Sequence, residues 1–144
     1  MCSVAHVALG ALIGSLINNH LAAFAMGLAS HIPLDIMPHF DFKDFRADAG
    51  VSIGLLGLIL LAGGFSPLLA GALGAVLPDF ENLLWKLGII DEKRKIFPTH
   101  SGLIEHGRAK GAGGIKAEIV LSALSVAVVL LAVFLRVFLR GGTA

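Results

Sequence analysis

One apolar run near the C-terminal end constrains the fold of this chain most strongly. Ala117–Leu139 carries Glu118 at its start and Arg136 near its end, and its other residues are almost all apolar or small. About 20 apolar residues in a helix cross the hydrocarbon core of a bilayer, and charged side chains near the helix ends can reach the interface. The run is therefore predicted to be a transmembrane helix.

The composition of the whole chain agrees with a membrane location. Of the 144 residues, 56% are apolar and 15% are charged, and the mean hydropathy is +0.87. Soluble domains are about 45–50% apolar and about 25% charged. A chain of this length has too little interior to bury the excess, so we expect lipid to cover part of its surface.

Charge and cysteine content argue against several classes of protein. The net charge of +1 gives no general attraction to nucleic acid, so no nucleic-acid partner is expected. The single cysteine, Cys2, excludes an internal disulfide and a cysteine-based metal cluster. No Lys or Arg precedes Lys43, so the first apolar run lacks the basic flank of an export signal and is expected to stay in the mature protein.

Two further apolar stretches, residues 4–29 and 51–77, are each interrupted near the middle. The interruptions are Asn18-Asn19-His20 and Gly63-Gly64-Phe65-Ser66-Pro67. A half of about 12–14 residues rises only roughly 18–21 Å, short of the roughly 30 Å hydrocarbon core. Because Asn, Gly and Pro favour turns, we predict two shallow helical hairpins; continuous spans with these residues at mid-membrane are the alternative.

The chain is thus predicted to be an all-α integral membrane protein that forms one domain, residues 1–144. Its expected segments are a helical hairpin over 4–37, a polar loop over 39–49, a second hairpin over 50–85, a basic polar loop over 86–116 and the transmembrane helix over 117–139.

The two hairpins bring polar residues to one height. His6 and His31 are equally far from the centre of the first turn, between Asn18 and Asn19. Asp79 returns from the second turn to the level of Ala49, where the chain leaves its polar loop. Because the helix rise per residue is constant, these residues should reach the same face. The residues expected there are His6, His31, Asp35, His39, Asp79 and Glu81.

His31 and Asp35 are four residues apart, so in a helix they share a face. They could hold one metal ion, or the carboxylate could orient a liganding imidazole. A hydrogen bond at a helix end is the alternative. Pro33 fits if it occupies the first turn of that helix, and Pro38 would then end the helix and leave His39 on the exit loop.

Two later polar segments complete the candidate site. Asp79 and Glu81 offer the hard oxygen donors that divalent ions use, although Asp79 could instead cap a helix. In Thr99-His100-Ser101 the hydroxyl residues could be caps, which leaves His100 unexplained. His106 lies in a charged stretch and is expected to be solvated.

The order of these motifs resembles the bacterial and archaeal family of membrane-bound metal-dependent hydrolases over residues 1–106. The motifs are His6, then His31, Asp35 and His39, then Leu77-Pro78-Asp79, and then Thr99-His100-Ser101. The family commonly has Asp, often followed by His, where this chain has Glu81 and Asn82. It often has His-Arg-Gly just before Thr-His-Ser, where this chain has Lys95-Ile96-Phe97-Pro98, which puts substrate contacts in doubt.

The convergence and the resemblance together predict a metal site. The expected metal ligands are His6, His31, Asp35, His39, Asp79 and His100. Imidazole and carboxylate without thiolate suit zinc, with manganese or iron as alternatives. A hydrolytic site would leave a position for water and use a carboxylate as base. Glu81 and Asp35 are the expected catalytic residues, and Asp79 could take the same role.

Three functions remain open at this point. The first is a hydrolase of phosphoester or other lipid-linked substrates at the membrane face. The second is a non-catalytic scaffold or interaction protein. The third is a metal or proton carrier, which would need polar ligands near mid-bilayer, so the depth of residues 18–20 discriminates it from the others.

The basic residues predict the orientation. Seven of the eleven Lys and Arg residues lie from Lys86 to Lys116, and short basic loops stay in the cytoplasm. We therefore expect a multi-pass protein of the inner (plasma) membrane whose metal face is cytoplasmic and whose C-terminal tail lies outside.

Overall fold

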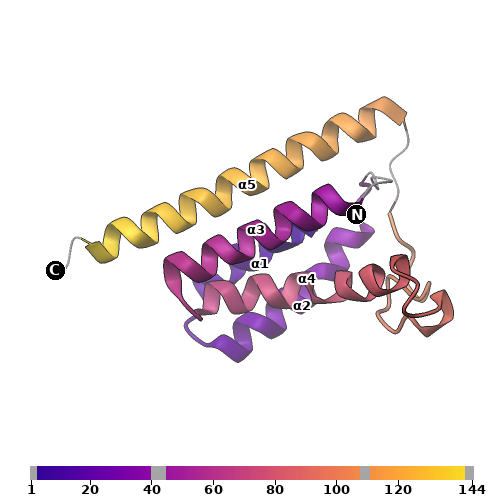
Figure 1. The fold of residues 1–144 in the computed structure, drawn as a ribbon, viewed down its shortest axis with the longest axis horizontal. Helices are drawn as coiled ribbons and strands as arrows, with labels where there is room; N and C mark the ends of the chain where they lie inside the picture. Colours follow the sequence, from indigo (N-terminus) through magenta and orange to yellow (C-terminus); the bar gives the residue numbers. More distant parts are fainter. Residues whose placement is uncertain (1–2, 40–44, 108–110, 142–144) are drawn as a thin grey trace.

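A computed structural model describes residues 3–39, 45–107 and 111–141, except for some side chains of the last segment, among them Glu118 and Arg136. Its elements are α1 (Ser3–Leu16), α2 (His20–Ile36), α3 (Phe45–Gly63), α4 (Pro67–Lys86), the short 3₁₀ helix η1 (Glu92–Arg94) and α5 (Gly111–Gly141). These ranges contain no β-strand, which confirms the all-helical prediction. Figure 1 shows α1–α4 running alongside one another, with α5 laid along one side of them. Cys2, Lys43, Arg108 and Lys110 lie outside the described residues.

The first interruption forms a turn between two helices. α1 ends at Leu16 and α2 begins at His20. The Asn19 side-chain oxygen accepts the N–H of Ala22 at 2.9 Å, so Asn19 caps α2 in the manner that favours Asn at this position. Residues 4–36 are therefore two helices joined by a turn, as the polar interruption predicts.

The second interruption forms a turn at the same end of the molecule. Gly64 has a φ of +62°, a conformation that glycine adopts without strain, and Pro67 occupies the first turn of α4. The His20 ring lies 3.2 Å from the carbonyl oxygen of Phe65 and stacks on the Phe65 ring. This contact joins the two turns, so both hairpins point the same way.

Two expected helix starts are wrong. Residues 45–49 belong to α3, whereas they were expected in a polar loop. Asp48 lies in the first turn of α3, and its carboxylate accepts the backbone N–H of Ser3 of α1 at 2.9 Å. This charged residue therefore has a hydrogen-bond partner although it is part of a helix. The basic segment 86–116 contains η1 and the start of α5, which begins at Gly111 and so ahead of Ala117.

Both internal prolines lie within continuous helices. Pro33 is inside α2, near its C-terminal end, and not in the first turn of a separate helix as predicted. α2 ends after Ile36, where Met37 donates its N–H to the Pro33 carbonyl oxygen at 3.2 Å. Pro78 is inside α4, so Asp79 does not cap a helix. Tertiary packing therefore overrides the local preference of proline for the first turn.

Close packing of α4 against α1 and α2 depends on glycine. A Cβ atom on Gly71 would overlap the carbonyl oxygen of Gly10, and one on Gly74 would overlap that of Phe24. The contacts of α4 with α1 and with α2 are the most extensive in the bundle. Since the backbones touch here, the residues on the adjoining turns of the three helices come within side-chain reach of one another.

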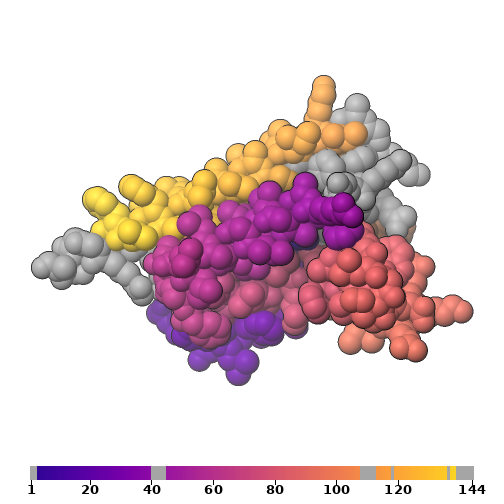
Figure 2. Space-filling model, in the orientation of Figure 1, coloured from indigo at the N-terminus to yellow at the C-terminus, as the bar shows by residue number. Residues whose placement is uncertain are grey.

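Two helices are long and apolar enough to cross a membrane. They are α3 and residues 113–135 of α5, and most of each lies on the outside of the molecule. The second overlaps the predicted run Ala117–Leu139. Figure 2 shows α5 as a ridge along the surface. Leu61 on α3 and Phe134 on α5 are among the large apolar side chains exposed there.

Candidate metal centre

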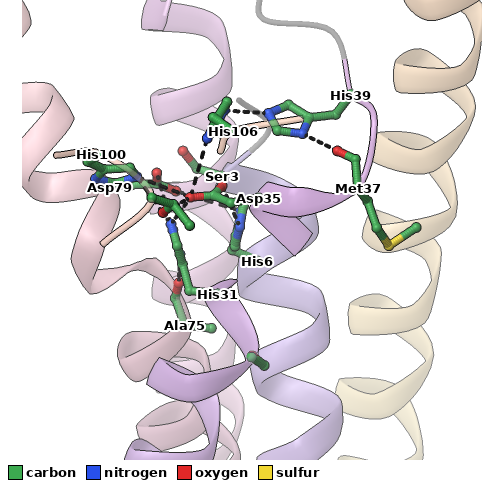
Figure 3. A network of polar contacts seen from close by, with 12 residues as sticks. Ser3, His6, His31, Asp35, Met37, His39, Ala75, Asp79, His100 and His106 are labelled. Atoms are coloured by element: carbon green, nitrogen blue, oxygen red, sulfur yellow. Dashed lines mark hydrogen bonds and ion pairs between the residues drawn. The ribbon is translucent and has the colours of Figure 1, made fainter. Parts of the chain in front are cut away.

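Eight polar side chains gather at the end of the bundle opposite the two turns. They come from α1, α2, α4 and the two loops that follow α2 and α4. They are His6, His31, Asp35, His39, Asp79, Glu81, His100 and His106. Figure 3 shows most of them converging around Asp35. All six residues predicted as ligands are in this cluster, whereas His20 lies at the far turn beside Phe65.

Asp35 is the centre of the cluster and is 0% exposed. Its Oδ2 lies 3.1 Å from Nε2 of His31 and 3.3 Å from Nε2 of His100. The same oxygen accepts the hydroxyl of Thr99 at 2.5 Å. Its Oδ1 faces Nε2 of His6 at 3.5 Å. Asp35 therefore contacts residues from α1, α2 and the loop after α4 at once.

His31 is held in one tautomer by the backbone. Its Nδ1 lies 2.6 Å from the carbonyl oxygen of Ala75. A carbonyl oxygen only accepts, so Nδ1 carries the proton, and in the neutral ring Nε2 has a free lone pair. That Nε2 faces Asp35 and lies 3.9 Å from Oδ1 of Asp79. This is the arrangement by which proteins orient a metal-binding imidazole.

His6 stands directly against His31. Their rings stack with centroids 4.0 Å apart, so the two residues equidistant from the first turn do reach one height. His6 Nδ1 lies 3.8 Å from Oδ2 of Asp79. The equal spacing therefore places the imidazole of His6 on α1 beside that of His31 on α2, and Asp79 of α4 faces both rings.

Several buried nitrogen and oxygen atoms that could bind a metal lack a hydrogen bond. Within the described residues, these include Asp35 Oδ1, Asp79 Oδ2 and His100 Nδ1. Leaving a buried carboxylate oxygen unpaired is costly, and proteins offset that cost with a partner or a metal. A cation held by a carboxylate and the histidines beside it would offset this cost.

His39 and His106 form the outer edge of the cluster. His39 Nδ1 donates to the Met37 carbonyl oxygen at 2.8 Å, and its Nε2 lies 2.9 Å from Nε2 of His106. His106 Nδ1 lies 3.7 Å from Oδ2 of Asp35. Burial lowers the pKa of His106 to about 4, so its ring is neutral near pH 7 and able to bind a metal.

The prediction that His106 is solvated is therefore wrong. The backbone holds it in place, because the N–H of Gly107 donates to the carbonyl oxygen of Asp35 at 2.8 Å. A Cβ atom on Gly107 would overlap the carbonyl oxygen of Ile36, so only glycine fits there. The glycine beside a histidine is the one sequence signal for this contact.

The carboxylate of Glu81, predicted as a catalytic group, is engaged by the loop after α4. One of its carboxylate oxygens accepts the N–H of Ile96, and the other accepts the N–H of Phe97 at 3.2 Å. Its Oε2 also lies 3.3 Å from Nδ1 of His100. Both oxygens are thus engaged by the loop that carries Thr99 and His100, which makes Glu81 a positioning residue for that loop.

The same loop is anchored by Lys95. Its amine lies 3.7 Å from the centroid of the Trp85 ring, and the side chain is buried. Burial lowers the pKa of this amine below its ordinary value, although Glu92 and Glu81 act in the opposite direction. Lys95 lies in the segment just before Thr-His-Ser, where the family that this chain resembles often has His-Arg-Gly. In this chain that segment holds a cation packed against Trp85 of α4.

Among the residues that the structure describes, three groups of His and Asp side chains have the spacing to hold a metal ion. They are His6, His31 and Asp79; His31, Asp35 and His100; and Asp35, His39 and His106. Neighbouring groups share His31 and Asp35. Nitrogen and oxygen donors without sulfur suit a divalent ion such as zinc, so the chemistry of the donor set fits the expected cofactor.

The chain was compared with protein-family models, curated proteins and solved structures, and none of them matches it.

Proposed function

We propose that the protein is a metal-dependent hydrolase that acts on phosphoester or other lipid-linked substrates at a membrane face. The observation that carries this proposal is the buried cluster in which Asp35, Asp79 and the histidines around them leave carboxylate oxygens without a hydrogen bond. The order of the sequence motifs, which resembles membrane-bound metal-dependent hydrolases, supports the same conclusion.

Within this proposal the central group, His31, Asp35 and His100, holds a divalent ion, with His6 and the outer histidines beside it. Zinc fits best, with manganese or iron as alternatives. When bound, the ion supplies the Lewis acidity that activates water and polarises an ester. The chain supplies orientation: Ala75 fixes the tautomer of His31, and Thr99 donates to Asp35.

Asp79 is the best-placed general base. Asp35 is fully buried and engaged by Thr99, and both oxygens of Glu81 accept backbone N–H groups. Asp79 Oδ2 has no hydrogen bond among the described residues, and Asp79 also lines the cavity beside the cluster. It can therefore accept a proton from a water on the cavity side, which moves the role of base from Glu81 to Asp79.

The membrane part of the proposal rests on helices α3 and α5. Each has an exposed apolar surface long enough for a bilayer core. We place the protein in the inner membrane as a multi-pass protein, with the cluster on the cytoplasmic side beside the basic residues of the loop after α4. Phosphate-bearing head groups are the substrates that such a site would meet, and nearby Lys side chains could neutralise them.

The test is a hydrolysis assay on protein loaded with zinc, manganese or iron. Wild type should cleave a phosphoester or lipid-linked ester, and chelation or the exchanges His31→Ala and His100→Ala should abolish cleavage. His20→Ala is the matched control because His20 lies at the far turn. If no ester in a panel of phosphoesters and acyl esters is cleaved, the hydrolase proposal is wrong and the cluster is a structural metal site of a scaffold.

A carrier role has less support. A carrier needs ligands near the middle of the membrane, usually on broken helices. Residues 18–20 form a turn and the start of a helix at the end of the bundle, and the donor cluster lies at the opposite end.

A further inference from the structure

An apolar cavity of about 550 Å³ lies beside the metal cluster. Its walls are formed mainly by α3 and α4. The apolar side chains that line it include Ile53, Leu56, Leu73, Val76, Leu77 and Leu83. No part of the metal cluster except Asp79 lines this cavity, so it is a separate space that meets the cluster at one residue.

Three charged residues in the described part of the chain line the cavity. Asp79 and Lys86 of α4 line it together with Asp48 of α3. Asp48 is occupied by the N–H groups of Ser3 and Val4, so its charge is committed to the start of α1. Lys86 lies over the ring of Phe45, 5.2 Å from its centroid. It gives the cavity lining a cation two helical turns beyond Asp79 on α4.

Ser52 adds a polar group to the wall itself. It lies one helical turn beyond Asp48 on α3, lines the cavity and is 3% exposed. Its Oγ has no hydrogen-bond partner among the residues that the structure describes. A buried hydroxyl without a partner points to a ligand oxygen, because leaving it unpaired costs free energy.

We propose that this cavity binds the aliphatic chain of an anionic phospholipid whose phosphate lies between Lys86 and the metal cluster. The apolar walls match the chain, Ser52 can donate to the ester oxygen below the head group, and Lys86 matches the charge of the phosphate. α3, which forms one wall, is also a helix with the length and composition to cross a membrane, so lipid tails would be its neighbours. The lipid-binding part of this inference is independent of the proposed function. Only the reaction of the head group at the metal cluster rests on it.

The experiment measures labelling by photoactivatable lipids in the absence of turnover. Zinc-loaded protein in detergent is irradiated with a phosphatidic acid whose phosphate ester is replaced by a non-hydrolysable phosphonate and whose acyl chain carries a diazirine. The comparison lipid is diacylglycerol with the same acyl chain. Labelled peptides are located by mass spectrometry. Wild type should be labelled on α3 and α4 around Leu56 and Val76, and at least about tenfold more strongly by phosphatidic acid, since charge-assisted contacts fix the head group.

Bulky substitutions test the cavity. Leu56→Trp and Ile53→Trp should each reduce labelling at least about tenfold, because the indole fills the space that the chain would occupy. Ile53 is 67% exposed, so its exchange tests the cavity even if Leu56→Trp fails to fold. Leu61→Trp is the control, since Leu61 lies on the same helix, is 87% exposed and does not line the cavity. Lys86→Ala should remove the preference for phosphatidic acid.

Two results would overturn the inference. One is labelling of Ile53→Trp as strong as that of Leu61→Trp, and the other is equal labelling of wild type by both lipids. Metal content and cleavage of a water-soluble phosphoester are measured on the same samples. Labelling without any cleavage contradicts the proposed hydrolase alone, and cleavage without specific labelling contradicts the lipid site alone.

Discussion

His31 links the backbone of α4 to the centre of the cluster. Its Nδ1 proton is fixed by Ala75, so its Nε2 lone pair is directed at Asp35. We expect His31→Ala to weaken metal binding by more than the roughly 10–100-fold that is typical for loss of a residue behind a ligand, because here a ligand itself is lost. The measurement is metal content and affinity of the purified protein.

The control for this prediction is His20→Ala. His20 contacts Phe65 at the far turn, so its removal should leave bound metal unchanged. Equal metal content in His31→Ala and wild type would show that the central group is not the binding site.

Glu81 and Asp79 should respond differently to loss of charge. Glu81→Gln replaces one of two acceptor oxygens by a donor, so the N–H of Ile96 or Phe97 loses its partner at a cost of about 1–3 kcal/mol. We expect faster hydrogen exchange over residues 96–101 and weaker metal binding through His100. Asp79→Asn should keep that loop and the metal, and lower turnover by about 10²–10⁴.

The two variants are compared by hydrogen exchange, metal content and turnover. If Glu81→Gln keeps a protected loop and full metal content but loses turnover, Glu81 is the base and Asp79 is not. Rescue of the loop by Glu81→Asp is not expected, because the shorter side chain cannot reach both N–H groups from α4.

At the scale of the helices, α4 is fixed by backbone contact with α1. A Cβ atom on Gly71 would overlap the carbonyl oxygen of Gly10. Gly71→Ala should therefore lower the free energy of unfolding by about 1–3 kcal/mol. It should also weaken metal binding by the central group, because it shifts α4, whose Ala75 carbonyl oxygen holds His31. Unfolding in detergent and metal content measure the two effects.

Gly57→Ala is the matched control, since a Cβ atom on Gly57 of α3 would meet nothing within 4 Å. Alanine is the better helix former, so this exchange should be neutral or stabilise the protein by about 0.5–1 kcal/mol. Equal destabilisation by the two exchanges would contradict the assignment of the α1–α4 contact to glycine.

Sequence spacing predicts the helical hairpins and much of the cluster for one physical reason. Helices rise by a constant distance per residue, so the turn at Asn18 and Asn19 fixes the relative height of His6 and His31. The polar and glycine-rich interruptions also fix the turns. Helix ends are harder to predict. Asp48 lies in the first turn of α3, where its carboxylate accepts the N–H groups of Ser3 and Val4 at the start of α1. This contact joins residues about 45 positions apart, so the local sequence does not reveal it.

The loop side of the site could not be predicted from local pattern. Its conformation depends on contacts between distant residues: Glu81 with the N–H groups of Ile96 and Phe97, and Gly107 with the carbonyl of Asp35. Periodicity carries no information about such contacts. This is why the place of His106 in the cluster could not be predicted.

At the scale of the whole molecule, the polar cluster and the basic residues of η1 lie at one end. Lys93 and Arg94 are exposed in η1, in the loop that follows α4 and leads to His100. The N-terminal end of α5 lies toward this end and its C-terminal end lies toward the two turns (Figure 1). Apolar side chains of α3 and α5 occupy the outer surface between the two ends. A bilayer around these helices would therefore separate the cluster from the C-terminal end of α5.

This arrangement predicts the topology. In a Cys2→Ala background, Lys93→Cys should react with a membrane-impermeant maleimide in inverted vesicles and not in right-side-out vesicles, since loops rich in Lys and Arg stay in the cytoplasm. A reporter enzyme fused after Ala144 should lie on the outer side of the membrane, because α5 carries the chain across the bilayer. Lysed vesicles show whether Lys93→Cys is reactive at all. Labelling of Lys93→Cys only from outside would reverse the orientation, and a cytoplasmic reporter together with cytoplasmic Lys93 would mean that α5 does not cross the membrane.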